Sequence, residues 1–217
     1  MYKIVVFDLD GTLVNSITDL AQSVNKGLVK CGLPTYSVEE YRYFVGNGRE
    51  VMLKKAMGEE NYNDANKADI VRSTFDTEYA AHSLDNTKPY EGCLELLSEL
   101  DKMGIKTAVL SNKPDEFVSR LVCTLFPNHK FDAAWGQKKE YKRKPSGEGL
   151  CAMLEKLGLE KKDCFYVGDS DVDVFTALDA GVDMCGAEWG FRDKEELIKA
   201  GAKITCKTPL ELLNFIK

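Results

Sequence analysis

The first fourteen residues, MYKIVVFDLDGTLV (1–14), decide the fold and point to the chemistry. Residues 3–7 form a run that is apolar after Lys3 and rich in β-branched side chains, which predicts a buried β-strand that ends at the turn Asp10–Gly11–Thr12. Asp8 directly follows this strand, where an ionised carboxylate costs free energy unless a cation pairs with it. We therefore interpret Asp8 as a functional residue rather than as a simple turn former.

Residues 15–84 carry a helical pattern. Ile17, Leu20, Val24 and Leu28 recur at three- and four-residue steps, which is typical of one face of a helix. This stretch contains almost no strand signal. The pattern predicts an all-helical block with helices at 15–30, 38–44, 49–57 and 64–82.

From residue 85 onward, strand and helix patterns alternate, which predicts a parallel sheet covered on both faces. The expected fold class is α/β: a doubly wound, Rossmann-like parallel sheet of residues 1–14 and 85–217, with a small all-helical cap of residues 15–84 inserted after the first strand. Two chain crossings join the parts, as in a hinged lid. Further strands are predicted at 105–110, 131–135, 164–167 and 181–185, and helices at 91–103, 114–125, 146–157, 171–180, 194–200 and 209–216.

Composition excludes several classes of protein. The 217 residues are 44% hydrophobic and 29% charged, as in a globular chain, and the net charge of −6 gives no general attraction for nucleic acid or anionic membranes. No apolar run approaches the ~20 residues of a membrane span, and the start lacks the pattern of a signal peptide. The seven cysteines are odd in number and form no CxxC motif, so we expect reduced thiols in a cytoplasmic protein.

Polar and charged residues follow four of the predicted strands. Ligands of an open parallel sheet bind outside the carboxyl ends of its strands, so these residues are expected at one edge. Clustered carboxylates need a counter-charge, and oxygen ligands suit Mg²⁺, while lysines beside them suit an anion. Together these groups are what phosphoryl transfer requires. The residues are Asp8, Asp10 and Thr12; Ser111, Asn112 and Lys113; Lys144 in the basic run 138–144; and Asp169, Ser170, Asp171 and Asp173.

A second interpretation is that each acid merely forms a turn or caps a helix. We favour this interpretation for Asp171, which can cap the helix predicted to follow it.

Four short motifs give the sequence a resemblance to a known family. The segment DLDGTL (8–13) resembles the signature of haloacid dehalogenase-like hydrolases. Ser111–Asn112–Lys113, Lys144–Pro145 and GDSDVD (168–173) are similar to the second, third and fourth motifs of that family. Each motif is only modestly specific, but all four occur in order at predicted strand ends.

The resemblance implies a role for each motif residue. Asp8 is the implied nucleophile that forms an aspartyl-phosphate, and Asp10 is the implied general acid and then base. Ser111 would donate a hydrogen bond to a phosphoryl oxygen, and Lys144 would neutralise Asp8 and the phosphoryl group. Thr12 and Asn112 are further candidates for substrate binding.

The resemblance also implies a Mg²⁺ site. Asp8 and Asp169 would supply side-chain oxygens, Asp10 its backbone carbonyl, and Asp173 would orient the metal's waters. A spacing of four would place Asp169 and Asp173 on one helical face, provided that the helix begins this early.

The second acid separates reactions within the family. Dehalogenases of this superfamily lack an acid at the position of Asp10, and phosphonatases usually carry a small residue there. Asp10 therefore favours hydrolysis of a phosphate ester over both.

The predicted cap contains a loop that resembles that of phosphoglycolate phosphatases. In YFVGNGRE (43–50), Gly46, Asn47 and Gly48 would let backbone N–H groups approach an anion at a helix start, and Arg49 could bind a carboxylate. The alternative is a plain turn that begins a helix, with a solvated arginine.

The expected function is hydrolysis of a small phosphorylated metabolite, with 2-phosphoglycolate as the favoured substrate. Alternatives are another phosphate (a sugar phosphate, a nucleotide or pyrophosphate), a sugar phosphomutase, or a non-catalytic binding protein. We expect a monomer or weak homodimer with no nucleic-acid or membrane partner. The loop 186–192, with Trp189 and Phe191, is either a wall of the site or a packed crossover loop.

Overall fold

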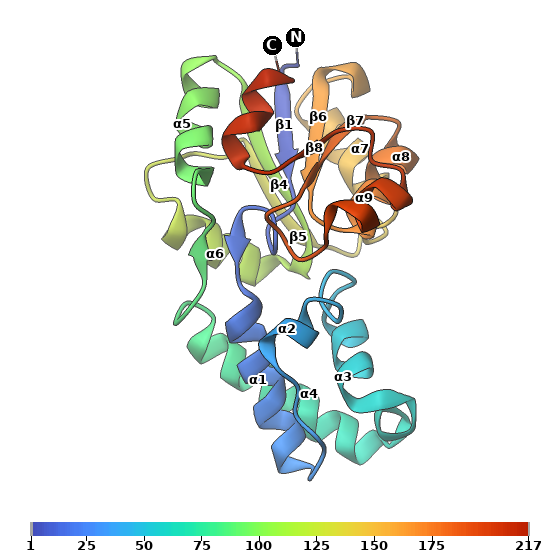
Figure 1. The fold of residues 1–217 in the computed structure, drawn as a ribbon. Coiled ribbons are helices and arrows are strands. Elements are labelled where there is room, and N and C mark those ends of the chain that lie inside the picture. Colours follow the sequence, from blue (N-terminus) through green and yellow to red (C-terminus); the bar gives the residue numbers. More distant parts are fainter. Residues whose placement is uncertain (1, 217) are drawn as a thin grey trace. The chain divides into compact units, whose positions relative to one another are not determined.

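A six-stranded parallel sheet forms the centre of the larger unit in this computed structural model, which describes residues 2–216 (Figure 1). The strand order is β5-β4-β1-β6-β7-β8, so the first strand of the chain lies inside the sheet. This order confirms the predicted doubly wound α/β fold. The strands are β1 (Ile4–Phe7), β4 (Lys106–Pro114), β5 (Ala133–Gln137), β6 (Cys164–Gly168), β7 (Asp183–Ala187) and β8 (Thr205–Cys206).

The register of the central strands brings the ends of β1 and β6 to one level. Phe7 of β1 pairs with Val109 of β4 and with Val167 of β6. The backbone N–H of Asp8 donates to the carbonyl of Val167 at 2.9 Å, which continues the pairing into the first motif. Residues that follow these parallel strands are therefore delivered to the same edge of the sheet.

Helices cover both faces of the sheet, which is why β1 is apolar throughout rather than alternating. Ile4 and Val6 pack in one buried cluster with side chains of α7, α8 and α9. Val5 and Phe7 point to the opposite face, on whose side Figure 1 shows α5 and α6. The helices of this unit are α5 (Cys93–Lys102), α6 (Asp115–Leu125), α7 (Glu148–Lys156), α8 (Asp171–Ala180) and α9 (Lys194–Ala200), with the 3-10 turns η1 (Lys161–Asp163) and η2 (Pro209–Asn214).

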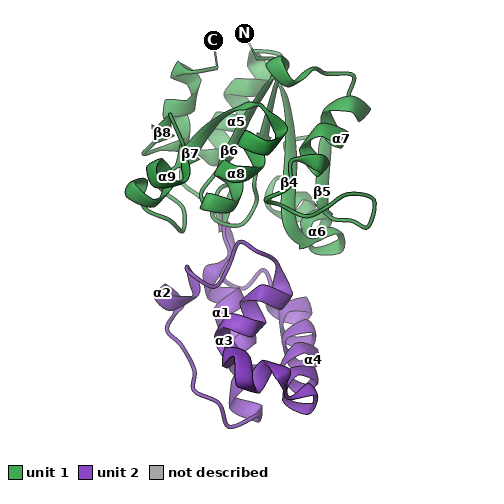
Figure 2. Cartoon of the chain, turned by 90° about the vertical axis from the view of Figure 1, so that its right-hand side faces the viewer, with its two compact units in different colours: residues 1–14, 89–217 green, residues 15–88 purple. Residues whose placement is uncertain are grey.

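The second unit, residues 15–88, is built from helices (Figure 2). Its first and last helices pack closely at Gly27, which has no Cβ atom. A Cβ atom there would lie only 3.0 Å from the Val71 carbonyl oxygen. The third helix is interrupted at Gly58, where φ is 73°, so the helix predicted to end at residue 57 continues after a break. The helices are α1 (Ile17–Lys30), α2 (Val38–Tyr41), α3 (Arg49–Asn63) and α4 (Ala65–His82).

The chain returns to the first unit at Pro89, four residues later than the boundary predicted after residue 84. The reason is Asp19 of α1, which is 2% exposed and accepts hydrogen bonds from the backbone and side chains of Asn86 and Thr87 at 2.7–3.1 Å. These bonds attach the returning segment to the helical unit. At the two crossings, β2 (Val14–Asn15) and β3 (Lys88–Pro89) form a two-stranded sheet.

Two predicted elements of the core are corrected by the structure. Residues 111–113 were predicted to follow a strand, but β4 continues through them to Pro114, with a shift of register against β5 after Leu110. The segment 209–216 forms a 3-10 helix over Pro209–Asn214 instead of an α-helix. Within residues 2–216, no helix combines the length and apolar character needed to cross a bilayer.

Asp19→Asn is expected to lower the free energy of unfolding by roughly 2–3 kcal/mol near neutral pH, because hydrogen bonds to a charged acceptor are stronger. Burial opposes ionisation of Asp19, but the bonds from Thr87 and Asn86 outweigh it and hold the pKa of this carboxyl below its usual value. The stabilisation is therefore complete above about pH 4 and is lost as the pH falls through the lowered pKa.

Urea unfolding of both proteins, near neutral pH and at the lowest pH at which the chain still folds, measures this difference. The cost of Asp19→Asn should decrease at low pH. An equal cost at both pH values would show that the charge of Asp19 does not stabilise the fold.

Candidate active site

Three carboxylates meet where β1 and β6 end. Asp8 follows β1, Asp169 follows β6, and Asp173 lies in the first turn of α8, and one oxygen of each lies within 4.8 Å of the others. They are 6%, 1% and 0% exposed. Because α8 begins at Asp171, Asp169 precedes the helix, and helical spacing is not what brings Asp169 and Asp173 together.

The Asp173 carboxylate is instead held close to Asp169 by the turn before α8. The backbone N–H and the hydroxyl of Ser170 donate to Asp173 Oδ2 at 3.1 and 2.6 Å. Ser170 is also the N-cap residue of α8, so the predicted capping role of Asp171 is wrong. Asp171 is the first helical residue and is not one of the three clustered carboxylates.

Lys144 supplies a positive charge to this acidic cluster. Its Nζ lies 2.8 Å from Asp8 Oδ1 and 2.7 Å from Asp173 Oδ1, and its side chain is 3% exposed. The hydroxyl of Tyr166 lies 3.1 Å from the same Nζ and donates to Asp173 Oδ1 at 2.9 Å. The ammonium group is therefore fixed against Asp8 by oxygens that come from β1, β6 and α8.

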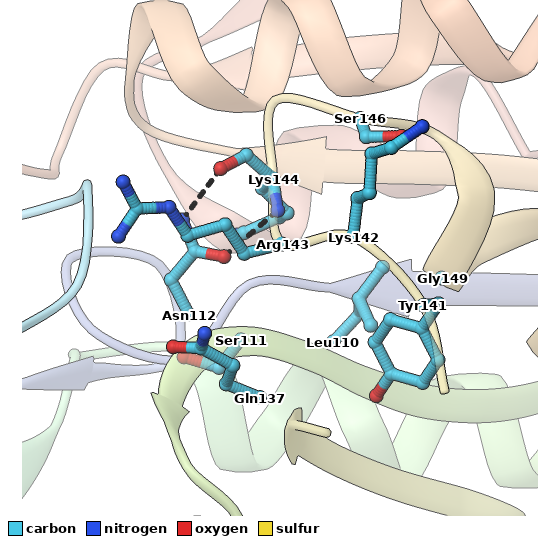
Figure 3. A pocket seen from close by; sticks show the side chains of 10 residues that line it. All are labelled: Leu110, Ser111, Asn112, Gln137, Tyr141, Lys142, Arg143, Lys144, Ser146 and Gly149. Atoms are coloured by element: carbon cyan, nitrogen blue, oxygen red, sulfur yellow. Dashed lines mark hydrogen bonds between the residues drawn. The ribbon is translucent and has the colours of Figure 1, made fainter. Parts of the chain in front are cut away.

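Asn112 fixes the backbone on which Lys144 lies. Its Oδ1 accepts from the N–H of Lys144 at 2.9 Å, and its Nδ2 donates to the carbonyl of Lys144 at 3.0 Å (Figure 3). The predicted substrate-binding residue Asn112 therefore has a clear structural contact, and its contact with substrate stays a prediction.

The charges of the cluster are not balanced by Lys144 alone. Burial raises the pKa of Asp8 to about 7, with Asp173 and Asp10 adding to the rise and Lys144 opposing it. Burial also raises the pKa of Asp169, assisted by the nearby Asp173 and Asp8. Burial disfavours the charged form of Lys144, but Asp173 and Asp8 outweigh it and raise the pKa of its ammonium. Three buried carboxylates beside one ammonium leave negative charge that a second cation would offset.

The donor set fits a hard divalent cation. All the clustered ligand atoms are carboxylate oxygens, which suit Mg²⁺ rather than a softer metal. Asp8 Oδ1 is buried and, apart from its ion pair with Lys144, has no hydrogen-bond partner among the described residues. A carboxylate oxygen with a single partner keeps a second lone pair with which it can bind a metal ion.

Asp10 faces Lys113, a residue of the second motif to which the resemblance implies no individual role. Lys113 Nζ lies 3.0 and 2.7 Å from the two carboxylate oxygens of Asp10, and both side chains are largely buried. The carboxylate of Asp10 is therefore held by Lys113 and is not one of the three clustered carboxylates. Lys113 lies in the second motif, but a contact with Asp10 across 103 positions of sequence leaves no local pattern.

Ser111 presents a hydroxyl close to this machinery. The residue is 5% exposed, and its Oγ accepts a hydrogen bond from the N–H of Lys113 at 3.3 Å. Within residues 2–216 the Ser111 hydroxyl donates to no acceptor, so its proton is available to an oxygen of a ligand.

The loop 186–192 packs against the first motif and positions Asp169. The backbone N–H of Phe191 donates to Asp169 Oδ2 at 2.8 Å, and the indole of Trp189 donates to the Thr12 carbonyl at 2.9 Å. Gly190 lies so close to Asp169 that a Cβ atom there would clash with it. Thr12 donates its hydroxyl to Asp169 Oδ1 at 3.0 Å, so this predicted substrate-binding residue orients a carboxylate. These contacts agree with the interpretation of 186–192 as a packed crossover loop.

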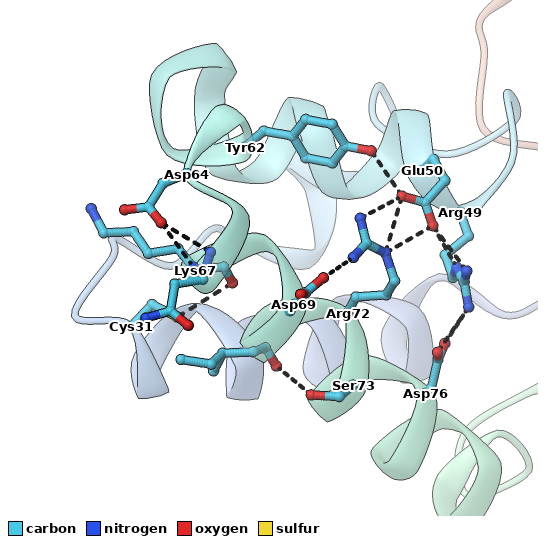
Figure 4. Close-up of polar contacts among 12 residues, drawn as sticks. Cys31, Arg49, Glu50, Tyr62, Asp64, Lys67, Asp69, Arg72, Ser73 and Asp76 are labelled. Carbon is cyan, nitrogen blue, oxygen red and sulfur yellow. Dashed lines mark hydrogen bonds and ion pairs between the residues drawn. The ribbon is translucent and has the colours of Figure 1, made fainter.

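The four cap candidates lie in the helical unit. Gly46 and Gly48 have positive φ values of 116° and 81°, and Gly48 is the N-cap of α3, as the glycine pattern predicted. Arg49 begins α3 and donates to both oxygens of Asp76 at 2.7 and 2.8 Å (Figure 4). Its Nε donates to Glu50 at 3.0 Å. Binding of a substrate by Gly46, Asn47, Gly48 and Arg49 stays a prediction.

Comparison with known proteins identifies the family. A model of haloacid dehalogenase-like hydrolases matches residues 5–187. The chain belongs to the haloacid dehalogenase-like hydrolase family. The membership confirms the resemblance drawn from the four motifs, and with the three clustered carboxylates it indicates a divalent metal at this site.

Relatives within this hydrolase family share most of the chain. The chain is 32% identical over 193 residues to phosphoglycolate phosphatase 1 of Pseudomonas aeruginosa, covering 87% of this chain and 70% of that protein. It is 28% identical to phosphoglycolate phosphatase of Vibrio parahaemolyticus over 218 residues, covering 99% and 96%. A crystal structure of a predicted phosphoglycolate phosphatase of Haemophilus somnus superposes with a TM-score of 0.92 at 27% identity, covering 100% of this chain and 98% of that chain.

Adding Mg²⁺ to the metal-free hydrolase is expected to raise its melting temperature, because a cation offsets the repulsion between Asp8, Asp169 and Asp173. Asp169→Asn removes one of these charges and one ligand, so most of this rise should be lost. Each kcal/mol of metal stabilisation corresponds to roughly 2–4 °C for a chain of this size.

Asp171→Asn is the matched control, because it removes an acid two residues away that lies outside the cluster, and it should retain the rise. Calorimetric scans with and without Mg²⁺ make the comparison. An undiminished rise in Asp169→Asn would place the metal elsewhere.

Proposed function

We propose that this hydrolase is a Mg²⁺-dependent phosphatase that hydrolyses a small phosphate monoester through an aspartyl-phosphate on Asp8. One observation carries the proposal. The buried carboxylate of Asp8 has its Oδ1 2.8 Å from Lys144 Nζ and belongs to the same cluster as the carboxylates of Asp169 and Asp173. A carboxylate in this setting can attack phosphorus while the cations balance the charge of both reactants. Mg²⁺, when bound by the carboxylates, would neutralise charge on the phosphoryl oxygens.

In the first step, an oxygen of Asp8 forms a bond to phosphorus as the bond to the leaving alcohol breaks. Asp10, in its protonated form, donates its proton to the departing oxygen and becomes a carboxylate, and Lys113 fixes the position of this group. Lys144 and the Ser111 hydroxyl hold phosphoryl oxygens. In the second step the Asp10 carboxylate takes a proton from water as the water oxygen forms a bond to phosphorus. The bond between Asp8 and phosphorus breaks, which releases inorganic phosphate and regenerates the Asp8 carboxylate.

The proposed substrate is 2-phosphoglycolate. The named relatives support it, since they are phosphoglycolate phosphatases that share most of the chain. A reducing compartment such as the cytoplasm is supported by the seven cysteines, which are all free thiols.

The direct test is release of inorganic phosphate from a panel of phosphate esters in Mg²⁺. We expect 2-phosphoglycolate to be hydrolysed with a higher kcat/KM than glycerol phosphate, and EDTA to abolish the activity. Undiminished activity after exhaustive treatment with EDTA would contradict the metal requirement. Equal rates for the two substrates would leave a phosphatase without the proposed preference.

Asp10→Asn is expected to slow the first step for an alkyl phosphate by roughly 10²–10⁴-fold, the usual contribution of a general acid. An activated aryl phosphate should lose much less in this step, because its leaving group needs no proton. Burst kinetics separate this step from the later attack of water. Equal losses in the burst for both substrates would exclude an acid role for Asp10.

A further inference from the structure

The basic run 138–144 contains positive charges that the catalytic cluster does not use. Lys138 Nζ lies 3.6 Å from Asp115 Oδ1, and Lys142 Nζ lies 2.6 Å from Glu148 Oε1. Acidic neighbours therefore balance the charges of both lysines. Lys139 and Arg143 are both exposed, and neither side chain forms an ion pair within residues 2–216. Two cations of this run are therefore available to an external anion.

Arg143 differs from Lys139 in its position. Arg143 directly precedes Lys144 and lies with Ser111, Asn112 and Lys144 around one narrow, closely packed crevice, whereas Lys139 is not among the residues of this crevice. In Figure 3 the Arg143 side chain runs past the Asn112 amide, and its guanidinium lies on the far side of Asn112 from Tyr141 and Gly149. The free guanidinium thus belongs to the same part of the core as the phosphoryl-binding candidates Ser111 and Lys144.

The backbone around Arg143 is held on both sides. The Asn112 amide forms two hydrogen bonds with the backbone of Lys144, and the carbonyl of Arg143 accepts from the N–H of Ser146 at 3.1 Å. The base of the Arg143 side chain is therefore fixed relative to Lys144. A charged side chain whose backbone is held in place loses less conformational entropy on binding an anion than a charged side chain on a mobile loop does.

Arg49 of the helical unit, unlike Arg143, already has acidic partners. Both oxygens of Asp76 and one oxygen of Glu50 already accept hydrogen bonds from Arg49. A substrate carboxylate at Arg49 would have to displace or share these acceptors, whereas Arg143 forms no ion pair among the described residues. A free guanidinium fork is the group that best recognises a carboxylate.

We propose that Arg143 binds the second anionic group of the substrate, a carboxylate close to the phosphate ester, and so selects carboxylated phosphate monoesters. The inference rests on the proposed phosphatase function of the same site. It places recognition of the carboxylate on the loop that carries Lys144, beside the groups that hold the phosphate.

Steady-state kinetics of Arg143→Ala test the proposal with 2-phosphoglycolate and with 4-nitrophenyl phosphate, which has no carboxylate. For 2-phosphoglycolate, kcat/KM should fall about tenfold to a hundredfold, the range of a charge-assisted hydrogen bond. The loss should lie mainly in KM, because the contact is the same in the ground state and the transition state. The value for 4-nitrophenyl phosphate should not change, and Arg143→Lys should lose less than Arg143→Ala.

Lys139→Ala is the matched control, because it removes an exposed, unpaired cation from the same run and should leave both substrates unaffected. Arg49→Ala serves as the competing variant. If Arg143→Ala lowers kcat/KM equally for both substrates, or for neither, Arg143 does not bind the carboxylate. If Arg49→Ala alone removes the preference, recognition belongs to the cap and the proposal is wrong.

A binding measurement separates this inference from the proposed function. Titration calorimetry compares 3-phosphonopropionate, a non-hydrolysable analogue with a carboxylate, with ethylphosphonate, which has none. The first should bind more tightly to the unaltered protein, and Arg143→Ala should remove the difference. That result supports Arg143 even if no ester is hydrolysed, whereas an unchanged difference overturns the inference even if the protein is a phosphatase.

Discussion

The contact of one buried ammonium group with two buried carboxylates is the interaction on which the site depends. Lys144 Nζ lies 2.8 Å from Asp8 Oδ1 and 2.7 Å from Asp173 Oδ1, and all three side chains are buried. Buried ion pairs of this kind contribute little net stability, because desolvation offsets their attraction. Removing Lys144 would nevertheless leave buried carboxylates without their cation. The arrangement is best explained as a site for a divalent cation, which offsets the negative charge that Lys144 leaves unbalanced.

The residues around the site hold the charged groups of Lys144, Asp169 and Asp173 in place. Asn112 fixes the backbone of Lys144, and the turn at Ser170 presents Asp173. The loop 186–192 and Thr12 orient Asp169 through hydrogen bonds to both of its oxygens. The parallel sheet makes this possible because the register of β1 and β6 ends them at the same level. Hydrogen bonds from the backbone and from uncharged side chains therefore determine where the charged groups lie.

The sequence predicted the elements and the acidic residues better than their contacts. The unbroken apolar run of β1 and the alternation after residue 85 were enough to predict a doubly wound sheet, because periodicity is local. The pairing of Lys113 with Asp10 and the use of Arg49 by Asp76 were not predicted, because they join residues 103 and 27 positions apart. For the same reason, the boundary at residue 84 was placed too early: the hydrogen bonds from Asn86 and Thr87 to Asp19 span 67 and 68 positions.

The central claim is that Asp8 becomes phosphorylated during turnover, and chemical trapping tests it most directly. Protein quenched with acid while it hydrolyses a phosphate ester is reduced with borohydride, which converts an aspartyl-phosphate to homoserine. Mass spectrometry of the tryptic peptide of residues 4–26 then locates the change. The account predicts homoserine at position 8, and none at Asp10, only when substrate and Mg²⁺ are both present. Rapid turnover with position 8 unmodified, or modification at another residue, would contradict it.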